Sequence, residues 1–278
     1  MPDFTTEVLA FLNQYAPTSI DTDADLDARF LLVSGKQLVV HPVPLRFDLD
    51  PQLRPRLSAA LSEQNLRLVH LSEADWRGKP TIVQSRLRAL LGISTRIPAR
   101  LTQVRRIDKP TLDKFLRDNH LQSTTTAKVK YGLFLPAQYF RILDFLPTQP
   151  ELLVAVASFS GAKNIVRGAA TYRSYELIRF ANLLDFTVVG GLDKLLKAFT
   201  KGIAPDDLMT YADRDWSGGS SYQKLGFELL SATPPQAFWV NPETFEKHPA
   251  ERQDDKPIPG NWIKTYNTGN WKFLKKLK

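Results

Sequence analysis

The densest group of side chains that could carry out chemistry lies in residues 207–228. Apolar residues up to Met209 predict a buried strand, and a short helix stopped by Gly226 follows a glycine turn at 218–219. Polar and aromatic residues crowd the end of the strand, at Tyr211, Asp213, Arg214, Asp215 and Trp216. Because α/β sheets bind ligands at the carboxyl ends of strands, this pattern predicts a functional site. The composition alone equally allows a charged turn between two core elements.

The elements that would position this group follow from hydrophobic periodicity. Helices are predicted at 5–15, 51–64, 79–91, 111–119 and 192–200. Strands are predicted at 28–33, 37–43, 66–71, 128–135, 152–159, 175–180 and around Leu208. We expect an acidic loop after the first helix, and prolines that interrupt the chain after residue 233. The alternation of strands and helices predicts an α/β fold of two domains, residues 1–95 and 96–278.

Length and composition limit the possible functions. The 278 residues allow one large or two ordinary domains. The absence of cysteine excludes disulfides, thiolate catalysis and iron–sulfur clusters. No apolar run approaches the ~20 residues that a membrane span needs, so we expect a soluble cytoplasmic protein with no membrane partner. The four histidines share no metal-binding spacing, and we expect no bound metal.

The positive charge is concentrated in the middle of the sequence. The net charge is +8, but residues 76–130 hold 13 Lys and Arg against 3 Asp. This density suits a polyphosphate backbone and predicts double-stranded DNA as a partner, although a solvated helix face is the simpler alternative. The candidate DNA contacts are Arg86, Arg88, Arg100, Arg105, Arg106, Lys128, Lys130, Arg214 and Trp216.

Several segments resemble a known family in the same order along the chain. YELIRFA at 175–181, TVVGGLDKLLK at 187–197 and YADRDWSGGSSYQKLGF at 211–227 resemble the C-terminal region of phage homing endonucleases with a Vsr-like, EDxHD-type nuclease domain. Further similar segments are LVHLSEADW at 68–76, IVQSRL at 82–87, FLRDNHLQ at 115–122 and TYNTGNWKF at 265–273. The resemblance implies a phage or mobile-element protein in a bacterial host.

This resemblance implies that residues 1–95 form a degenerate Vsr or PD-(D/E)XK-like nuclease fold. Metal-dependent phosphodiester cleavage requires clustered carboxylates. The resemblance places remnants of such a cluster at Glu7, Asp27, Glu73 and Asp75. The segment LVVHPVP at 38–44 has no acid where the family has one, so we expect a DNA-docking domain. A homing endonuclease, active or decayed, in which the second domain only recognises DNA is the alternative.

The second half of the chain is similar to GNAT-fold acyltransferases in its order of strand, glycine turn, helix and strand. The resemblance implies that Gly190, Gly191 and Lys194 bind the pyrophosphate of an activated donor, with Arg179 on the preceding strand. The chain departs from the family pattern at Thr187, Leu192 and Asp193. The donor therefore stays open between acyl-CoA and another activated molecule.

A narrower similarity concerns the Tyr-Ala-Asp segment. Tyr211, Ala212, Asp213, Gly219, Tyr222 and Gln223 are similar to Mom-type phage proteins, GNAT-like enzymes that modify adenine in DNA. The similarity implies that Asp213 orients or deprotonates an exocyclic amine, that Tyr211 or Tyr222 hydrogen-bonds it, and that Trp216 stacks on the base. The predicted function is group transfer to a DNA base. The other alternative is an N-acyltransferase for a small amine or a protein.

Overall fold

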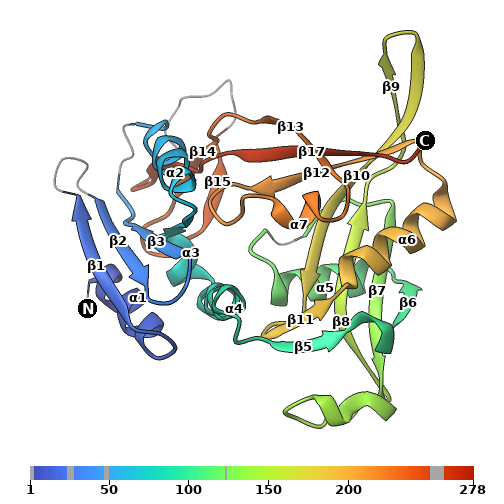
Figure 1. Cartoon of the computed structure of the whole chain (residues 1–278), viewed down its shortest axis with the longest axis horizontal. Helices are drawn as coiled ribbons and strands as arrows, with labels where there is room; N and C mark the ends of the chain where they lie inside the picture. The colour runs from blue at the N-terminus through green and yellow to red at the C-terminus, as the bar shows by residue number, and fades with distance from the viewer. Residues whose placement is uncertain (1–2, 24–27, 47–49, 123, 251–259) are drawn as a thin grey trace. The chain divides into compact units, whose positions relative to one another are not determined.

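The computed structural model describes residues 3–23, 28–46, 50–122, 124–250 and 260–278 of a mixed α/β fold (Figure 1). The chain divides into two compact units. Unit 1 contains residues 1–80, 212–220 and 231–271. Unit 2 contains residues 81–211, 221–230 and 272–278. The two units therefore do not follow the single boundary expected at residue 95, because the chain returns to unit 1 twice after residue 211.

The main sheet of unit 1 has four strands in the order β1-β2-β3-β4. The first three are antiparallel, and β4 runs parallel to β3. Buried apolar residues on α1, β2, β3 and β4, among them Val8, Leu31 and Val69, form the core. The elements are α1 Phe4–Asn13, β1 Thr18–Asp23, β2 Ala28–Val33, β3 Leu38–Val43, α2 Leu53–Glu63, β4 Arg67–Ser72 and α3 Glu73–Gly78.

Two predictions for this unit are wrong. The expected acidic loop forms the edge strand β1, which is almost entirely exposed and pairs with β2 over its whole length. An exposed edge strand has no hydrophobic alternation, so its sequence reads as a loop. The proline-containing region also forms a second sheet in the order β15-β14-β16, with β14 Ala237–Val240, β15 Lys247–Pro249 and β16 Ile263–Tyr266.

The central sheet of unit 2 follows the order β13-β17-β12-β10-β8-β7-β6, with β9 paired to β10. A separate parallel pair joins β5 to β11. The strands are β5 Thr95–Pro98, β6 Gln103–Arg106, β7 Val129–Pro136, β8 Glu151–Phe159, β9 Lys163–Arg167, β10 Ala170–Asn182, β11 Phe186–Val189, β12 Asp207–Asp213, β13 Glu228–Ala232 and β17 Asn270–Lys276. The helices are α4 Pro80–Leu91, α5 Lys109–Asn119, α6 Gly191–Ile203 and α7 Ser220–Gln223, with short 3₁₀ turns η1 Ala99–Leu101 and η2 Ala137–Ile142.

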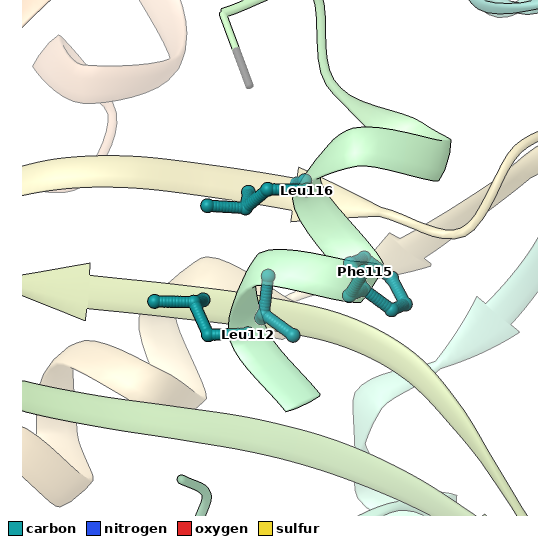
Figure 2. Packing of buried hydrophobic residues seen from close by; sticks show 5 residues of the cluster. Leu112, Phe115 and Leu116 are labelled. Carbon is teal, nitrogen blue, oxygen red and sulfur yellow. The ribbon is translucent and has the colours of Figure 1, made fainter. Parts of the chain in front are cut away.

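Helix α5 packs on the sheet through Leu112, Phe115 and Leu116, which contact Val156 on β8 and Ala181 on β10 (Figure 2). These three residues lie on one side of α5 because they are spaced three and four positions apart. Helix α6 packs through Phe199, whose ring stacks on Phe159 of β8 at 3.9 Å and lies edge-on to Tyr175 of β10. Val156 and Phe159 are an odd number of residues apart on one strand, so the two helices cover opposite faces of the sheet.

A β-bulge in β10 makes this arrangement possible. Leu177 pairs with Phe159 and Arg179 with Ser158, so Ile178 is an extra residue in β10. The bulge shifts the alternation of side chains. As a result Tyr175 packs under α6, whereas Ala181, six residues later, packs under α5. Among the described residues, no helix has the length and apolar character needed to cross a membrane.

Candidate functional site

Strands β10 and β12 in unit 2 are paired at first and then diverge, and we call the place where they separate the fork. They run parallel and pair from Ser174 with Asp207 to Leu177 with Thr210. Beyond Leu177, β10 is no longer paired with β12, but it remains paired with β8 as far as Asn182. The bulge at Ile178 lies directly after the last pair. The fork therefore opens at the carboxyl ends of two parallel strands, where α/β folds bind ligands.

The phenol of Tyr222 lies at the start of the fork. Its hydroxyl forms a hydrogen bond with the side chain of Thr210. Thr210 in turn donates to the carbonyl of Leu177 at 3.0 Å, which links Tyr222 to the last paired position of the two strands. The ring of Tyr222 packs on Phe227 and Phe273, with centroids 5.7 and 5.6 Å apart. These contacts fix both ends of the side chain, as a group that transfers a proton requires.

Tyr222 is protonated at neutral pH, as an ordinary phenol is, and its surroundings raise its pKa further. Burial raises the pKa of Tyr222, and the hydrogen bond with Thr210 and the charges of Arg86 and Arg179 only partly oppose this. Arg179 donates from Nη1 to the carbonyl of Ile178 at 2.8 Å, so its guanidinium stays at the bulge. Two of the predicted site residues, Tyr222 and Arg179, thus lie together. The predicted DNA contact Arg86 lies with them. Tyr211 is on the same strand as Thr210 and is 37% exposed.

The predicted glycine turn is followed by a helix, as expected, but its lysine makes a different contact from the one predicted. Gly190 has φ +78°, a left-handed conformation that favours glycine, and it is the N-cap of α6 without a side-chain cap. A Cβ on Gly191 would lie 2.9 Å from Val188 Cγ1, so close packing requires glycine there. Lys194 Nζ donates to the carbonyls of Ala99, at 2.9 Å, and Thr102. Its ammonium therefore holds η1 in place, which differs from the phosphate contact we expected.

Two arginines, Arg96 and Arg100, lie near the glycine turn. Arg96 is placed there by the pairing of two short strands, and Arg100 by the packing of its neighbour Ala99. β5 and β11 are parallel, with Arg96 opposite Thr187 and Pro98 opposite Val189. A Cβ built on Gly190 would lie 3.7 Å from that of Ala99, so the next residue, Arg100, lies beside the turn. Arg96 and Arg100 are both exposed. The amino end of α6 and these cations together offer an anion a positive environment.

The segment Asp213–Trp216 belongs to unit 1 and is held by its fold. Asp213 Oδ1 accepts the N–H of Asp215 at 3.0 Å, and its carbonyl accepts that of Trp216 at 3.2 Å. The carbonyl of Asp215 accepts the backbone N–H of His70 at 2.9 Å, and that of Trp216 accepts a bond from Arg67 at 2.7 Å. Trp216 is only 2% exposed, so its ring has no open face for a base. In this structure these residues form a turn that is attached to β4 by hydrogen bonds.

The remaining predicted DNA contacts differ in their partners and in their exposure, and Arg105 is both ion-paired and exposed. Arg88 pairs with Asp185 at 2.6 Å, Arg105 pairs with Glu151, and Lys130 donates to the carbonyl of Ala127 at 2.9 Å. Arg214 lies 4.3 Å from the centre of the Trp271 ring. The residues exposed to solvent are Arg100, Arg105, Arg106 and Lys128.

The predicted nuclease remnants form ion pairs with basic side chains. Glu7 accepts from Arg77 Nη1 at 2.9 Å, Glu73 accepts from Arg77 Nε at 3.3 Å, and Asp75 lies 2.8 Å from Lys247. Asp27 lies outside the described residues. Across the described part of the chain, no three His, Asp or Glu side chains gather in a group that could hold a metal ion.

The structure also joins two residues that the sequence did not connect. His41 on β3 and His70 on β4 occupy paired positions of the parallel strands, and their Nδ1 atoms lie 2.9 Å apart. Both side chains are buried. The only signal in the sequence was a histidine within each of two predicted strands, and the register of those strands cannot be read from local spacing.

Comparisons with known proteins give low overall similarity. No protein-family model matches the sequence, and no curated protein matches it. Among solved structures, a Bacillus subtilis acetyltransferase in complex with CoA is 14% identical, covers 64% of this chain and 99% of its own, and has a TM-score of 0.33. The NatC complex bound to Gag peptide and CoA gives 9% identity, the same coverages and a TM-score of 0.36. A KacTA–DNA complex gives 18% identity over 47% of this chain and 86% of its own, with a TM-score of 0.31. At these TM-scores the similarities by themselves assign neither a family nor an activity.

Proposed function

We propose that unit 2 is a group transferase that moves an acyl group from an acyl-CoA-type donor to an amine. The observation that carries this proposal is the fork between β10 and β12, with the bulge at Ile178 and the phenol of Tyr222 at its start. The GNAT-like order of the segments at 175–181, 187–197 and 211–227 supports the same class.

The donor site is proposed at the amino end of α6. The backbone N–H groups of the first turn and the helix dipole favour an anion, and Arg96 and Arg100 add two charges beside the turn. Asp193 carries the opposite charge, but it pairs with Lys197 at 2.6 Å on the helix surface. When bound, an acyl-CoA supplies a thioester carbonyl that an amine can attack.

Tyr222 is the proposed proton donor. A phenol is protonated at neutral pH, burial raises the pKa of Tyr222 further, and the hydrogen bond with Thr210 fixes the hydroxyl at the fork. A protonated phenol can give its proton to the leaving thiolate, which departs as a neutral thiol, and the proton that the amine loses on acylation then restores the phenol through solvent. The backbone around Ile178, where the ladder is interrupted, is the proposed position for the reacting carbonyl.

The proposed acceptor is an exocyclic amine of a DNA base. The exposed side chains of Arg100, Arg106 and Lys128 support this choice, because cations attract a phosphate backbone. An amine on a protein or small molecule is the second candidate, and it is favoured by the ion pairs that Arg88 and Arg105 already form.

The test is incubation of DNA with protein and acetyl-CoA, followed by mass spectrometry of the nucleosides and measurement of released thiol. We expect a new nucleoside mass and DNA-dependent thiol release. Tyr222→Phe should lower the rate by at least tenfold, whereas Tyr172→Phe, on the same sheet, should leave it unchanged. Thiol release without any modified nucleoside would move the acceptor to another amine. No CoA binding at all would refute the proposal.

A further inference from the structure

Unit 2 contains a groove of about 350 Å³ between α6, the beginning of β12 and the C-terminal end of β17. We call it the α6 groove, and the residues that line it are Asp193, Leu196, Lys197, Thr200, Lys201, Leu208, Lys275 and Leu277. Its volume lies at the lower end of the range for small-molecule sites. None of the described side chains assigned to the acyl transfer lines this groove, so it is a second candidate site in the same unit.

The α6 groove is long, because it follows the helix. Its five residues on α6 are spaced three and four positions apart, from Asp193 to Lys201, and therefore lie on one side of the helix. Eight positions at about 1.5 Å each give a length of about 12 Å. A linear chain of about ten carbon atoms has this length, at roughly 1.3 Å for each bond along an extended chain.

The floor of the α6 groove is apolar. Leu196 and Leu208 line it and are 5% and 1% exposed, so they lie at its base. Leu277 also lines it and is half-buried. The methylene stems of the lining lysines add apolar surface around these leucines. A hydrocarbon chain in the groove would remove this surface from water, which is favourable.

The rim of the α6 groove is positively charged, with three lysines against one aspartate. Lys197 pairs with Asp193 at 2.6 Å, so these two charges balance. Lys275 donates to the carbonyl of Leu225 at 2.6 Å, which fixes its ammonium and uses one of its three N–H groups. Lys201 is exposed. The two remaining positive charges beside an apolar floor favour a ligand with a negative head and an apolar body.

We propose that the α6 groove binds an amphipathic monoanion, a linear hydrocarbon chain of about ten carbons with a terminal carboxylate, as in a medium-chain fatty acid. The chain lies over Leu196, Leu208 and Leu277, and the lysines of the rim, above all Lys201, attract the carboxylate. A neutral or cationic chain of the same length lacks this attraction. The inference does not depend on the acyl transfer proposed for the fork.

The first experiment measures how affinity depends on chain length. The full-length protein is titrated by calorimetry with hexanoate, octanoate, decanoate, dodecanoate and tetradecanoate, each below its micelle-forming concentration. We expect one bound molecule per protein and an affinity that rises about twofold per added methylene, since an open groove buries about half of each methylene. The rise should stop near decanoate, where the chain reaches the length of the groove. Binding without saturation, or a rise that continues unchanged to tetradecanoate, would overturn the proposal.

The second experiment tests the charge of the head group. Octanoate is compared with octanol and with octylamine at the same ionic strength. We expect octanoate to bind about fivefold more tightly than octanol, as an ion pair at a partly exposed site allows, and octylamine to bind most weakly. Equal affinities for the three compounds would refute a role for the lysines of the rim.

Variants separate the α6 groove from the rest of the surface. Lys201→Gln should weaken octanoate binding about fivefold and leave octanol binding unchanged. The matched control is Lys224→Gln, because Lys224 is exposed in the same unit and does not line the groove. Leu277→Asn should weaken octanoate and octanol alike. If Leu277→Asn does not fold, the two lysine variants still decide, and equal octanoate affinities in those two would refute the site.

The same titration distinguishes this site from the fork. Tyr222→Phe should bind octanoate with wild-type affinity, because Tyr222 does not line the α6 groove. A failure of the proposed acyl transfer would therefore leave this result unchanged. Loss of octanoate binding in Tyr222→Phe would place the fatty acid at the fork and contradict the proposal.

Discussion

Acid should destabilise unit 1 through the buried pair His41 and His70. Both pKa values are lowered by burial, that of His41 to about 3 and that of His70 well below its ordinary range. Unfolding exposes both rings, and each then takes up a proton near its ordinary value of 6.5. The unfolded chain thus binds more protons below pH 6.5, so stability falls as pH falls from 6.5 toward 3.

The size of the effect follows from the difference between the two states. Each pH unit in this window costs up to about 1.4 kcal/mol per histidine. Between pH 7 and pH 4.5, His41 alone should lower the free energy of unfolding by about 2.5 kcal/mol. His70 adds a contribution of the same sign. Asp215 opposes it, because burial raises the pKa of its carboxyl and the folded state binds that proton first.

Tryptophan fluorescence is the appropriate probe because all five tryptophans lie in unit 1. Urea unfolding would be followed at several pH values between 7 and 4.5 for the wild-type protein and for the double variant His41→Asn, His70→Asn. The variant should be less stable at pH 7 and much less dependent on pH. Comparing the two slopes also removes the contribution of Asp215. The control His248→Asn alters a side chain that is 47% exposed and should keep the wild-type slope.

The outcome that refutes this reasoning is a wild-type stability that stays constant between pH 7 and 4.5. A slope that persists in the double variant would equally assign the acid sensitivity to other groups.

Two further predictions concern glycine packing and the phenol of Tyr222. Gly191→Ala should lower the stability of the protein by about 1–3 kcal/mol in thermal unfolding followed by circular dichroism, because its Cβ would meet packed atoms at 2.9 Å. Gly218→Ala, with nothing within 4 Å of the added Cβ, should change it by less than about 0.5 kcal/mol, and equal effects would contradict the packing argument. The phenol of Tyr222 should titrate above the ordinary tyrosine value near 10. The measurement is the difference between absorbance titrations of the wild-type protein and of Tyr222→Phe. A difference that titrates at or below 10 would contradict the effect of burial on this phenol.

The sequence predicts the elements that bury a regular apolar pattern. β2 at Ala28–Val33 coincides with its prediction, and α4 and β8 agree within one residue at either end, because alternation or helical periodicity marks them locally. The short strand β11, four residues long, escaped prediction because its stability comes from pairing with β5, about ninety residues earlier. The bulge at Ile178 could not be predicted from the sequence for the same reason, because it is defined only by the pairing of β10 with β8.

The candidate sites show the same division between local and long-range information. Gly190 could be identified from sequence because a left-handed residue before a helix is a local requirement. The association of Tyr222 with Arg86 and Arg179 could not, because three separate segments contribute to it. Nor could the contact between His41 and His70, which depends on the register of two parallel strands.

The conspicuous polar cluster at 211–216 illustrates why residue type does not assign chemistry. Asp213 caps a turn and Trp216 is buried, and hydrogen bonds tie that turn to β4 of unit 1. Loss of activity in Asp213→Ala would therefore be expected from a weakened turn alone, whatever the reaction. Tyr222→Phe removes one hydroxyl and keeps the ring between Phe227 and Phe273. It is consequently the substitution whose kinetic effect reports on proton transfer and not on folding.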